Sequence, residues 1–236
     1  MADYYLHVEL LVEEKNAQDF ENVVNDPRLR EIFAPFGWKL RYGLRGRKPR
    51  SLERGRERGS RTLAKGSTQT ENCVRFVNIW DVPDPPGLAE VMQRLTDDNV
   101  YVAANSIVVR EIQNLVSVAR PPSPAGNTGT FIEVHRRFPV RNLGAFVYKS
   151  GIPVPLLESN GWINCGAYQA LTGPLNSVTE VWYTENRFEN TPGTFYELVR
   201  KAGGLNGSGP WMEKICEELD TLPDQEWRDT MDSYLK

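Results

Sequence analysis

Cysteine is scarce in this chain of 236 residues. Cys73, Cys165 and Cys216 are odd in number and far apart, and they form neither a CxxC pair nor a zinc-ligand spacing. A disulfide framework and a structural zinc site are therefore disfavoured, and a reducing compartment is expected. The sequence also lacks the basic and apolar regions of a secretion signal, and no apolar run is long enough to cross a bilayer. We expect a cytoplasmic protein that has no membrane partner.

Common catalytic and nucleotide-binding signatures are also missing. The sequence has no GxGxxG before an expected helix, no Walker loop and no GxSxG elbow. The Gly-rich run at 203–209 lies between two expected helices, so a hinge or loop is its expected role. A net charge of -3 and a pI near 5.6 argue against a protein whose whole surface coats nucleic acid or membrane.

What the chain does contain is an internal repeat. In both halves an apolar strand-like segment comes first, a Gly-Trp pair opens a second such segment, and an Asn-x-Val triplet opens a third. A duplication with one order of elements predicts two copies of one fold. The matching segments are Tyr5–Glu9 and Phe131–His135, Gly37-Trp38 and Gly161-Trp162, and Asn72-Cys73-Val74 and Asn176-Ser177-Val178.

The residue patterns predict the order β-α-β-β-α-β in each copy. Pro27 should interrupt the first helix, and the Pro-rich segment 121–129 should link the copies. The expected strands are 4–12, 38–44, 72–80 and 111–119, then 130–138, 162–170, 176–184 and a short closing strand at 225–235. The expected helices are 17–33 and 88–95, then 141–159, 194–201 and 211–220.

Such a sheet carries its helices on one face and leaves the other face bare. Two such sheets in one chain can bury their bare faces by packing face to face. The expected fold class is therefore α+β, with two tandem ferredoxin-like βαββαβ units that form a single-chain α+β barrel. The expected domains are residues 1–120 and 130–236, joined by the linker 121–129.

The second copy resembles a known family. Gly161-Trp162 opens a strand, Gly173–Asn176 forms a Gly-x-Leu-Asn turn, and Val181-Trp182 lies in the next strand. In these features residues 130–200 resemble NIPSNAP-type domains, whereas the first copy lacks the turn. The resemblance implies the dimeric α+β barrel fold, here in tandem. It implies little about chemistry, because that superfamily includes cofactor-free oxygenases, cyclases, isomerases, haem enzymes and proteins without a known reaction.

The two histidines of the chain lie in the first strand of each copy. Alternate residues of these strands are apolar and should face the helices, so the residues between them should point into the barrel. Each histidine lies two residues from a glutamate. The expected inward residues are Tyr5, His7 and Glu9 in the first copy, and Phe131, Glu133, His135 and Arg137 in the second.

We interpret these residues as an acid–base site, because a histidine moves protons near neutral pH and a neighbouring carboxylate fixes its tautomer. His135 and His7 would move protons, Glu133 and Glu9 would assist them, and Arg137 would anchor a substrate oxygen. Two alternatives stay open: strands whose polar face meets water, and an iron or manganese site of two His and two Glu. Either histidine could also bind a haem, although no other feature of the sequence points to one.

Three more residues are expected to line the same cavity. Glu180 and Trp182 share one face of a strand in the second copy, and Tyr168 lies on the strand before it. Polar groups among aromatic rings suit an aromatic or polyketide-like ligand, and Tyr5 would add to the aromatic surface. The alternative is that Trp182 and Tyr168 are ordinary core residues.

The largest difference between the copies is a basic insertion at about residues 45–68 of the first. Residues 45–65 contain nine Lys or Arg and two Glu, so their net charge is about +7. This composition cannot form a core and predicts a mobile segment. A lid over an anionic substrate and an arm for phosphate-rich partners are the functional alternatives to an idle loop. The lack of interleaved aromatic residues weakens the nucleic-acid interpretation.

The expected function is that of a cofactor-independent small-molecule enzyme of biosynthesis. It would be a cyclase, isomerase, dehydratase or oxygenase that acts on an aromatic or polyketide-like substrate in the barrel interior. The alternative is a non-catalytic NIPSNAP-like protein that binds a ligand or serves as a scaffold. We expect no organic cofactor, no metal and no nucleic-acid partner, and a homodimer stays open.

Overall fold

The computed structural model describes residues 4–47, 73–126, 128–137, 154–185, 198 and 225–235. The chain divides into two compact units, Met1–Val116 with Ser233–Lys236, and Ser117–Asp232. The basic insertion beyond residue 47, the Gly-rich run 203–209, the helix expected at 211–220 and most of those at 141–159 and 194–201 lie outside the described residues.

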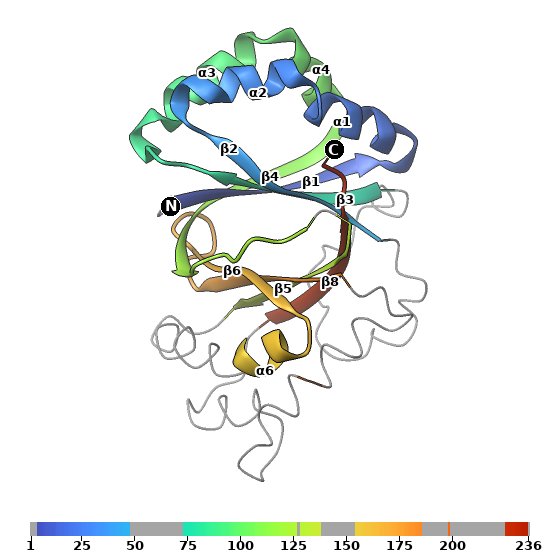
Figure 1. The fold of residues 1–236 in the computed structure, drawn as a ribbon. Coiled ribbons are helices and arrows are strands. Elements are labelled where there is room, and N and C mark those ends of the chain that lie inside the picture. The colour runs from blue at the N-terminus through green and yellow to red at the C-terminus, as the bar shows by residue number, and fades with distance from the viewer. Residues whose placement is uncertain are drawn as a thin grey trace. The chain divides into compact units, whose positions relative to one another are not determined.

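The fold is mixed α+β, and its eight strands are hydrogen-bonded in the closed order β1-β3-β2-β8-β5-β7-β6-β4 (Figure 1). This confirms the fold class predicted from the sequence. Within the order, β4-β1-β3-β2 and β8-β5-β7-β6 form two runs of the same kind. In each run the fourth strand of its copy lies beside the first, which is the strand order of a ferredoxin-like sheet.

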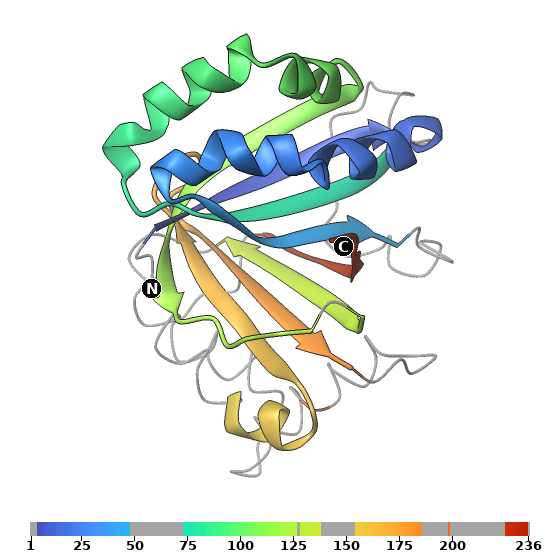
Figure 2. The same cartoon turned by 45° about the horizontal axis from the view of Figure 1, so that its top comes forward.

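In the first unit, helices lie along one face of the sheet (Figures 1 and 2). Pro27 begins a second helix and does not continue the first, as its missing N–H and fixed φ angle predict. The strands are β1 (Tyr4–Glu13), β2 (Lys39–Gly46), β3 (Cys73–Asp81) and β4 (Val108–Arg120). The helices are α1 (Ala17–Val24), α2 (Pro27–Phe33), α3 (Leu88–Asp97) and α4 (Asn99–Ser106), with short 3₁₀ turns at Glu14–Asn16, Ala34–Phe36 and Pro85–Gly87.

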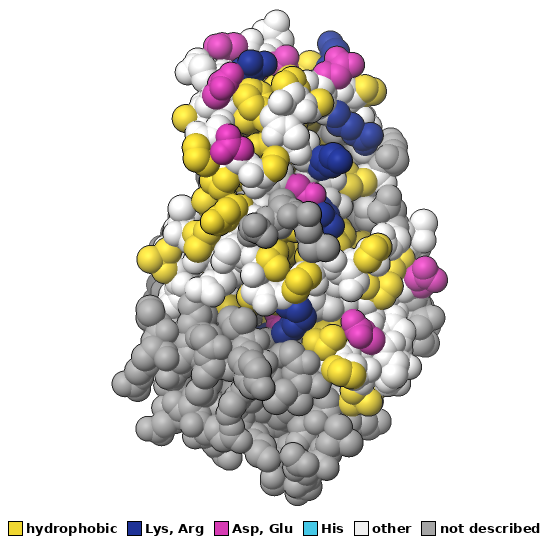
Figure 3. Space-filling view, turned by 60° about the vertical axis from the view of Figure 1, so that its left-hand side comes forward, with side chains coloured by type: hydrophobic (Ala, Val, Ile, Leu, Met, Phe, Trp, Pro, Cys, Tyr) yellow, Lys and Arg dark blue, Asp and Glu magenta, His cyan; other side chains and the backbone are white. Residues whose placement is uncertain are grey.

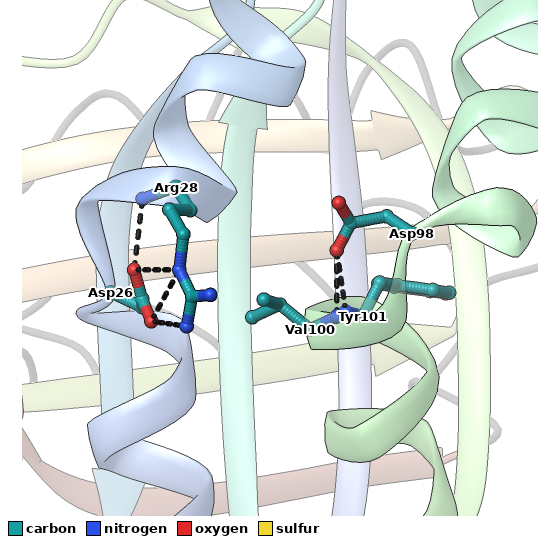
Figure 4. A network of polar contacts seen from close by, with 5 residues as sticks. All are labelled: Asp26, Arg28, Asp98, Val100 and Tyr101. Carbon is teal, nitrogen blue, oxygen red and sulfur yellow. Dashed lines mark hydrogen bonds and ion pairs between the residues drawn. The ribbon is translucent and has the colours of Figure 1, made fainter.

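Two aspartates define where helices begin (Figure 4). The Asp26 carboxylate accepts a hydrogen bond of 2.9 Å from the backbone N–H of Arg28, at the start of α2. The Asp98 carboxylate accepts bonds of 2.7 Å and 3.1 Å from the backbone N–H groups of Val100 and Tyr101, at the start of α4. Each cap satisfies N–H groups that the first helical turn leaves without a partner. The sequence pattern did not indicate α4.

The repeated Gly-Trp pair is a helix stop in both units. Gly37 and Gly161 have φ angles of 70° and 81°, in the left-handed region that favours glycine. The backbone N–H of Trp38 then bonds back to the carbonyl of Phe33, and that of Trp162 bonds to Leu157. These bonds span five residues and close a Schellman motif, which satisfies the last carbonyls of a helix.

The core of the first unit lies between its sheet and its helices. Leu6, Val8 and Leu10 of β1 all belong to this core, which confirms that their face of the strand meets the helices. Tyr234 also belongs to it, although it comes from the far end of the chain. Its ring lies 5.4 Å from that of Phe76, its N–H donates to the carbonyl of Gly43, and its hydroxyl donates to the side-chain oxygen of Asn78.

The second unit repeats this plan among its described residues. A short helix, α6 (Val154–Ser159), packs Leu157 against Ile132, Val134, Trp162 and Trp182. The strands are β5 (Thr130–Arg137), β6 (Ile163–Ala170), β7 (Ser177–Thr184) and β8 (Gln225–Ser233). β8 is the closing strand that was expected near the end of the chain. In both units the strand after the Gly-Trp pair carries a register shift, in β2 between Leu40 and Tyr42 and in β6 between Asn164 and Ala167.

Strand pairing confirms the repeat residue by residue. In the first unit Leu6 pairs with Trp80 and Val8 with Asn78. In the second unit Ile132 pairs with Trp182 and Val134 with Glu180. The second copy therefore places Glu133 where the first has His7, and His135 where the first has Glu9. The two copies therefore carry a histidine and a glutamate at the same two strand positions, but in exchanged order.

Candidate functional site

The face of the second unit's sheet that carries His135 is distinct from the face that meets α6. Ile132 and Val134 pack with Leu157 of α6, so the residues between them point the other way. Glu133 on that other face has no exposed surface, and His135 is half-buried. The two-faced strand expected from the sequence is therefore present in β5.

His135 is held by a neighbouring threonine. Its Nδ1 atom lies 2.9 Å from the hydroxyl oxygen of Thr179, its partner in the register of β5 and β7. A hydroxyl can donate or accept, so this contact suits either tautomer of the ring. Thr179 is itself buried, with 6% of its surface exposed. The pair fixes the direction in which the imidazole presents its second nitrogen, which is the usual task of such a contact beside an acid–base histidine.

Tyr168 lies in the same row of side chains. It pairs with Thr179 across β6 and β7, so Tyr168, Thr179 and His135 are lateral neighbours on one face. The Tyr168 hydroxyl donates a 2.7 Å hydrogen bond to the carbonyl of Cys165. Gly166 has a φ angle of 115°, and a Cβ atom there would lie 2.5 Å from the ring of Tyr168. Only glycine therefore permits the bulge that turns the phenol back on its own strand.

Arg137 is a cation on this face, and its Nε atom has no hydrogen-bond partner among the described residues. It pairs with Ser177 in the register and lies two residues beyond His135. Its Nε atom is buried and makes no hydrogen bond, and no carboxylate forms an ion pair with its guanidinium among the described residues. A buried, unpaired donor of a charged group costs free energy of roughly 1–3 kcal/mol or more. A buried donor of this kind can be satisfied by a water molecule, an ion or an atom of a ligand.

Glu180 and Trp182 do not join this set, contrary to the cavity expected from the sequence. Trp182 pairs with Ile132 and packs in the core against α6. Glu180 pairs with Val134, on the same side of the sheet as Trp182. Both therefore lie on the opposite face from His135. Their shared face of β7 was predicted correctly, but the sequence alone does not tell which face of β5 it matches.

Glu180 belongs instead to a buried ionic cluster. Its carboxylate accepts hydrogen bonds from Arg136 at 2.5 Å and from Arg120 at 3.3 Å. Glu180 and Arg136 each expose 3% of their surface. Burial of these charges is tolerated because each is paired. The sequence pattern did not predict a role for Arg120, Arg136 or Thr179, because none of them shares a strand face with a histidine in its own strand.

In the first unit the corresponding face is occupied by ion pairs. Glu9 forms a 2.8 Å ion pair with Arg75. The Glu9 carboxylate, which was expected to assist a histidine, is therefore paired with an arginine. His7 is buried, with 6% of its surface exposed. Tyr5 is fully buried, and the guanidinium carbon of Arg41 lies 5.5 Å from the centre of its ring. Among its described residues this unit therefore offers His7 but no cation comparable with Arg137.

Among the described residues, no group of three or more His, Cys, Asp and Glu side chains has the geometry to hold a metal ion. No helix in the described parts of the chain is long and apolar enough to span a membrane.

Comparisons with known proteins bear on the fold. No protein-family model and no curated protein sequence matches this chain. Solved structures of α+β barrels do match it in three dimensions. A candidate monooxygenase from Lactobacillus acidophilus NCFM aligns with a TM-score of 0.59 and 8% identity, covering 99% of this chain and 95% of its own.

Two further structures are similar. An anthrone oxidase-like protein aligns with a TM-score of 0.54 and 8% identity, covering 99% of this chain and 93% of its own. A chlorite dismutase variant from Candidatus Nitrospira defluvii gives a TM-score of 0.52 at 8% identity, with the same coverage. At this level of identity the likeness establishes the dimeric α+β barrel fold and no particular activity.

Proposed function

We propose that this protein is a small-molecule enzyme that works by acid–base chemistry without an organic cofactor, and that its site is the His135 face of the second unit. The proposed substrate is an aromatic or polyketide-like molecule with a C–H group made acidic by conjugation with a carbonyl. The observation that carries the proposal is Arg137, whose buried Nε atom has no hydrogen-bond partner among the described residues and which lies two residues from a histidine held by Thr179.

In the proposed reaction His135 removes a proton from a carbon that is conjugated with the substrate carbonyl through the ring system. The electron pair of the broken C–H bond moves into the ring system and places negative charge on the carbonyl oxygen. Arg137 stabilises that oxygen, because a guanidinium donates charge-assisted hydrogen bonds to an oxyanion. The fully buried Glu133 and the phenol ring of Tyr168 shape the site. Reprotonation at another carbon gives isomerisation, and reaction of the carbanion with dioxygen gives oxygenation.

One likeness supports this class of chemistry, and a second suggests an alternative to it. Structures that resemble the whole chain include proteins named as a candidate monooxygenase and as anthrone oxidase-like. Residues 130–200 also resemble NIPSNAP-type domains, from which the competing proposal comes: a protein that binds an aromatic ligand without transforming it. The two proposals differ only in whether His135 moves a proton.

Anthrone is a suitable probe, because its methylene group is conjugated through the rings with the carbonyl opposite to it and its hydrogens are therefore acidic. The wild-type protein should accelerate exchange of the methylene hydrogens in D₂O above the buffer rate, measured by proton NMR under nitrogen. His135→Gln should reduce the accelerated rate by about 10²–10⁴-fold, the usual contribution of a general base. Under air, formation of the quinone and one water per dioxygen would identify the oxygenation branch.

The controls separate binding from chemistry. Arg137→Gln should weaken anthrone binding and slow exchange, whereas Arg110→Gln, which changes an exposed arginine of β4, should do neither. Saturable binding without acceleration of exchange would favour the ligand-binding protein. Equal acceleration by the wild type and by His135→Gln would contradict the proposed site.

A further inference from the structure

The first unit contains a cavity of about 70 Å³ between its helices and its sheet. Its apolar walls are formed by side chains of α2, α3, β1 and β3, among them Phe33, Leu95, Val8 and Trp80. One water molecule needs roughly 10–15 Å³ of such space, so the cavity has room for about five groups of that size. That is enough for a single aromatic ring or a short alkyl chain.

Polar side chains line this cavity where it meets solvent. Tyr101 and Asn105 of α4 and Glu111 and Gln113 of β4 are among its lining residues, and Asn105 and Gln113 are exposed. The Gln113 amide donates a 2.6 Å hydrogen bond to the carboxylate of Glu111. Burial raises the pKa of the Tyr101 phenol, and the negative charge of Glu111 raises it further. Glu111 is the one charged side chain among the described residues that line the cavity.

Both the size and the position of the cavity distinguish it from an ordinary packing defect. Protein interiors contain few voids larger than a water molecule. On β1 the residues that face the helices are apolar, whereas the neighbouring strand β4 presents Glu111 and Gln113 to the cavity. Helix α4 buries only Ala104 of its eight residues, so it closes this corner of the helical layer loosely. Hydrophobic side chains reach the surface among charged ones in the part of the molecule that carries the helices (Figure 3).

We propose that this cavity binds a small amphipathic amine. The apolar body of the ligand would lie against Phe33, Leu95 and Trp80, and its protonated amino group would lie at the mouth beside Glu111. A concave apolar site with a few polar groups at its rim is the usual form of a small-molecule pocket. The charge of Glu111 selects a cation over an anion at that rim. All the lining residues belong to the first unit, so the inference is independent of the function proposed for His135.

Benzylamine is the probe for this site, and phenylacetate is its anionic counterpart. Titration of the full chain, followed by methyl NMR and by calorimetry, should show saturable binding of benzylamine with shifts at Leu95 and Val8. Glu111→Gln should weaken that binding by about tenfold, because a charge-assisted contact becomes a neutral one. Phenylacetate should bind more weakly than benzylamine to the wild type, and the Glu111→Gln variant should lose this preference.

A matched pair on α4 tests the location. Ala104→Leu places extra methyl groups in the cavity and should abolish benzylamine binding, whereas Val102→Leu changes a side chain that is 50% exposed and should leave binding unchanged. The proposal is wrong if benzylamine does not saturate the wild-type protein, or if phenylacetate binds as tightly. It is equally wrong if folded Ala104→Leu binds benzylamine as the wild type does. Should Ala104→Leu fail to fold, the shifts in the wild type and the Glu111→Gln titration decide the matter.

Discussion

Arg136 and Arg137 are adjacent in β5, but their side chains lie on opposite faces of the sheet and in opposite electrostatic surroundings. Arg136 is buried against the Glu180 carboxylate at 2.5 Å. Arg137 has a buried Nε atom without a hydrogen bond. Removing one partner of a buried ion pair, such as Arg136, leaves an uncompensated buried charge and destabilises the fold. Removing Arg137 takes away a buried donor that makes no hydrogen bond, and so removes an unfavourable contribution to the free energy of folding.

These surroundings predict opposite results for one substitution at two neighbouring positions. Arg136→Met should lower the free energy of unfolding by about 3 kcal/mol, toward the lower end of the range for a broken buried pair, because Arg120 still contacts Glu180. Arg137→Met should leave it unchanged or raise it by up to about 1 kcal/mol. Urea unfolding of both variants measures the difference. A larger loss from Arg137→Met than from Arg136→Met would show that Arg137 serves the fold and not a ligand.

Thr179 is expected to act as a positioning residue for His135. Thr179→Val keeps the shape of the side chain but removes the hydroxyl that lies 2.9 Å from Nδ1 of the ring. Anthrone exchange by this variant should fall by about tenfold, and its pH profile should shift, because the tautomer is no longer fixed. Thr179→Ser, which keeps the hydroxyl, should restore both. An unchanged pH profile in Thr179→Val would argue against this role.

At the scale of elements, α4 depends on its cap. Asp98 satisfies two backbone N–H groups at the start of a helix that buries only Ala104, so little other packing holds that end. Asp98→Ala should therefore cost about 0.5–2 kcal/mol of stability. Asp97→Ala, at an exposed position one residue earlier, should cost much less. Thermal unfolding compares the two, and equal losses would mean that the cap contributes nothing of its own.

Most strands could be predicted from the sequence, because alternating or continuous apolar segments and the repeated Gly-Trp helix stop are local signals. Helix α4 was missed, since Asp98 caps it directly after α3 without a glycine or proline between them. The site was predicted only in part. Alternation placed Glu133 and His135 on one face of β5, but the register that pairs Thr179 with His135 depends on contacts between distant strands. The isolation of Arg137 likewise depends on what surrounds it in the folded protein.

At the scale of the whole molecule, residues near position 234 complete the first unit. The hydroxyl of Tyr234 donates to Asn78, and its ring packs with Phe20 and Phe76. Tyr234→Ala should cost about 3–5 kcal/mol, as large-to-small changes of buried aromatic residues do. Tyr234→Phe should cost about 1–3 kcal/mol, because it leaves the Asn78 oxygen without its donor.

The same tyrosine should make stability fall in alkaline solution. Burial raises the pKa of Tyr234 far above its ordinary value near 10, and the hydrogen bond from its hydroxyl to Asn78 offsets only part of that rise. The folded state therefore keeps a proton that the unfolded chain loses, and the free energy of unfolding should decline as pH rises above about 10. Urea unfolding between pH 8 and about 11 measures the slope. Tyr234→Phe should flatten it, and an identical slope in both proteins would contradict this linkage.

The position of Tyr234 in the first unit also has a consequence for synthesis on the ribosome. The last strand of the first unit, β4, ends at Arg120, but a core residue of that unit is not translated until more than a hundred residues later. At about 5–20 residues per second, the unit would wait at least several seconds with the Phe20 and Phe76 surface uncovered. Nascent chains arrested before residue 234 should accordingly be more sensitive to protease in this unit, and more dependent on chaperones, than chains arrested after it.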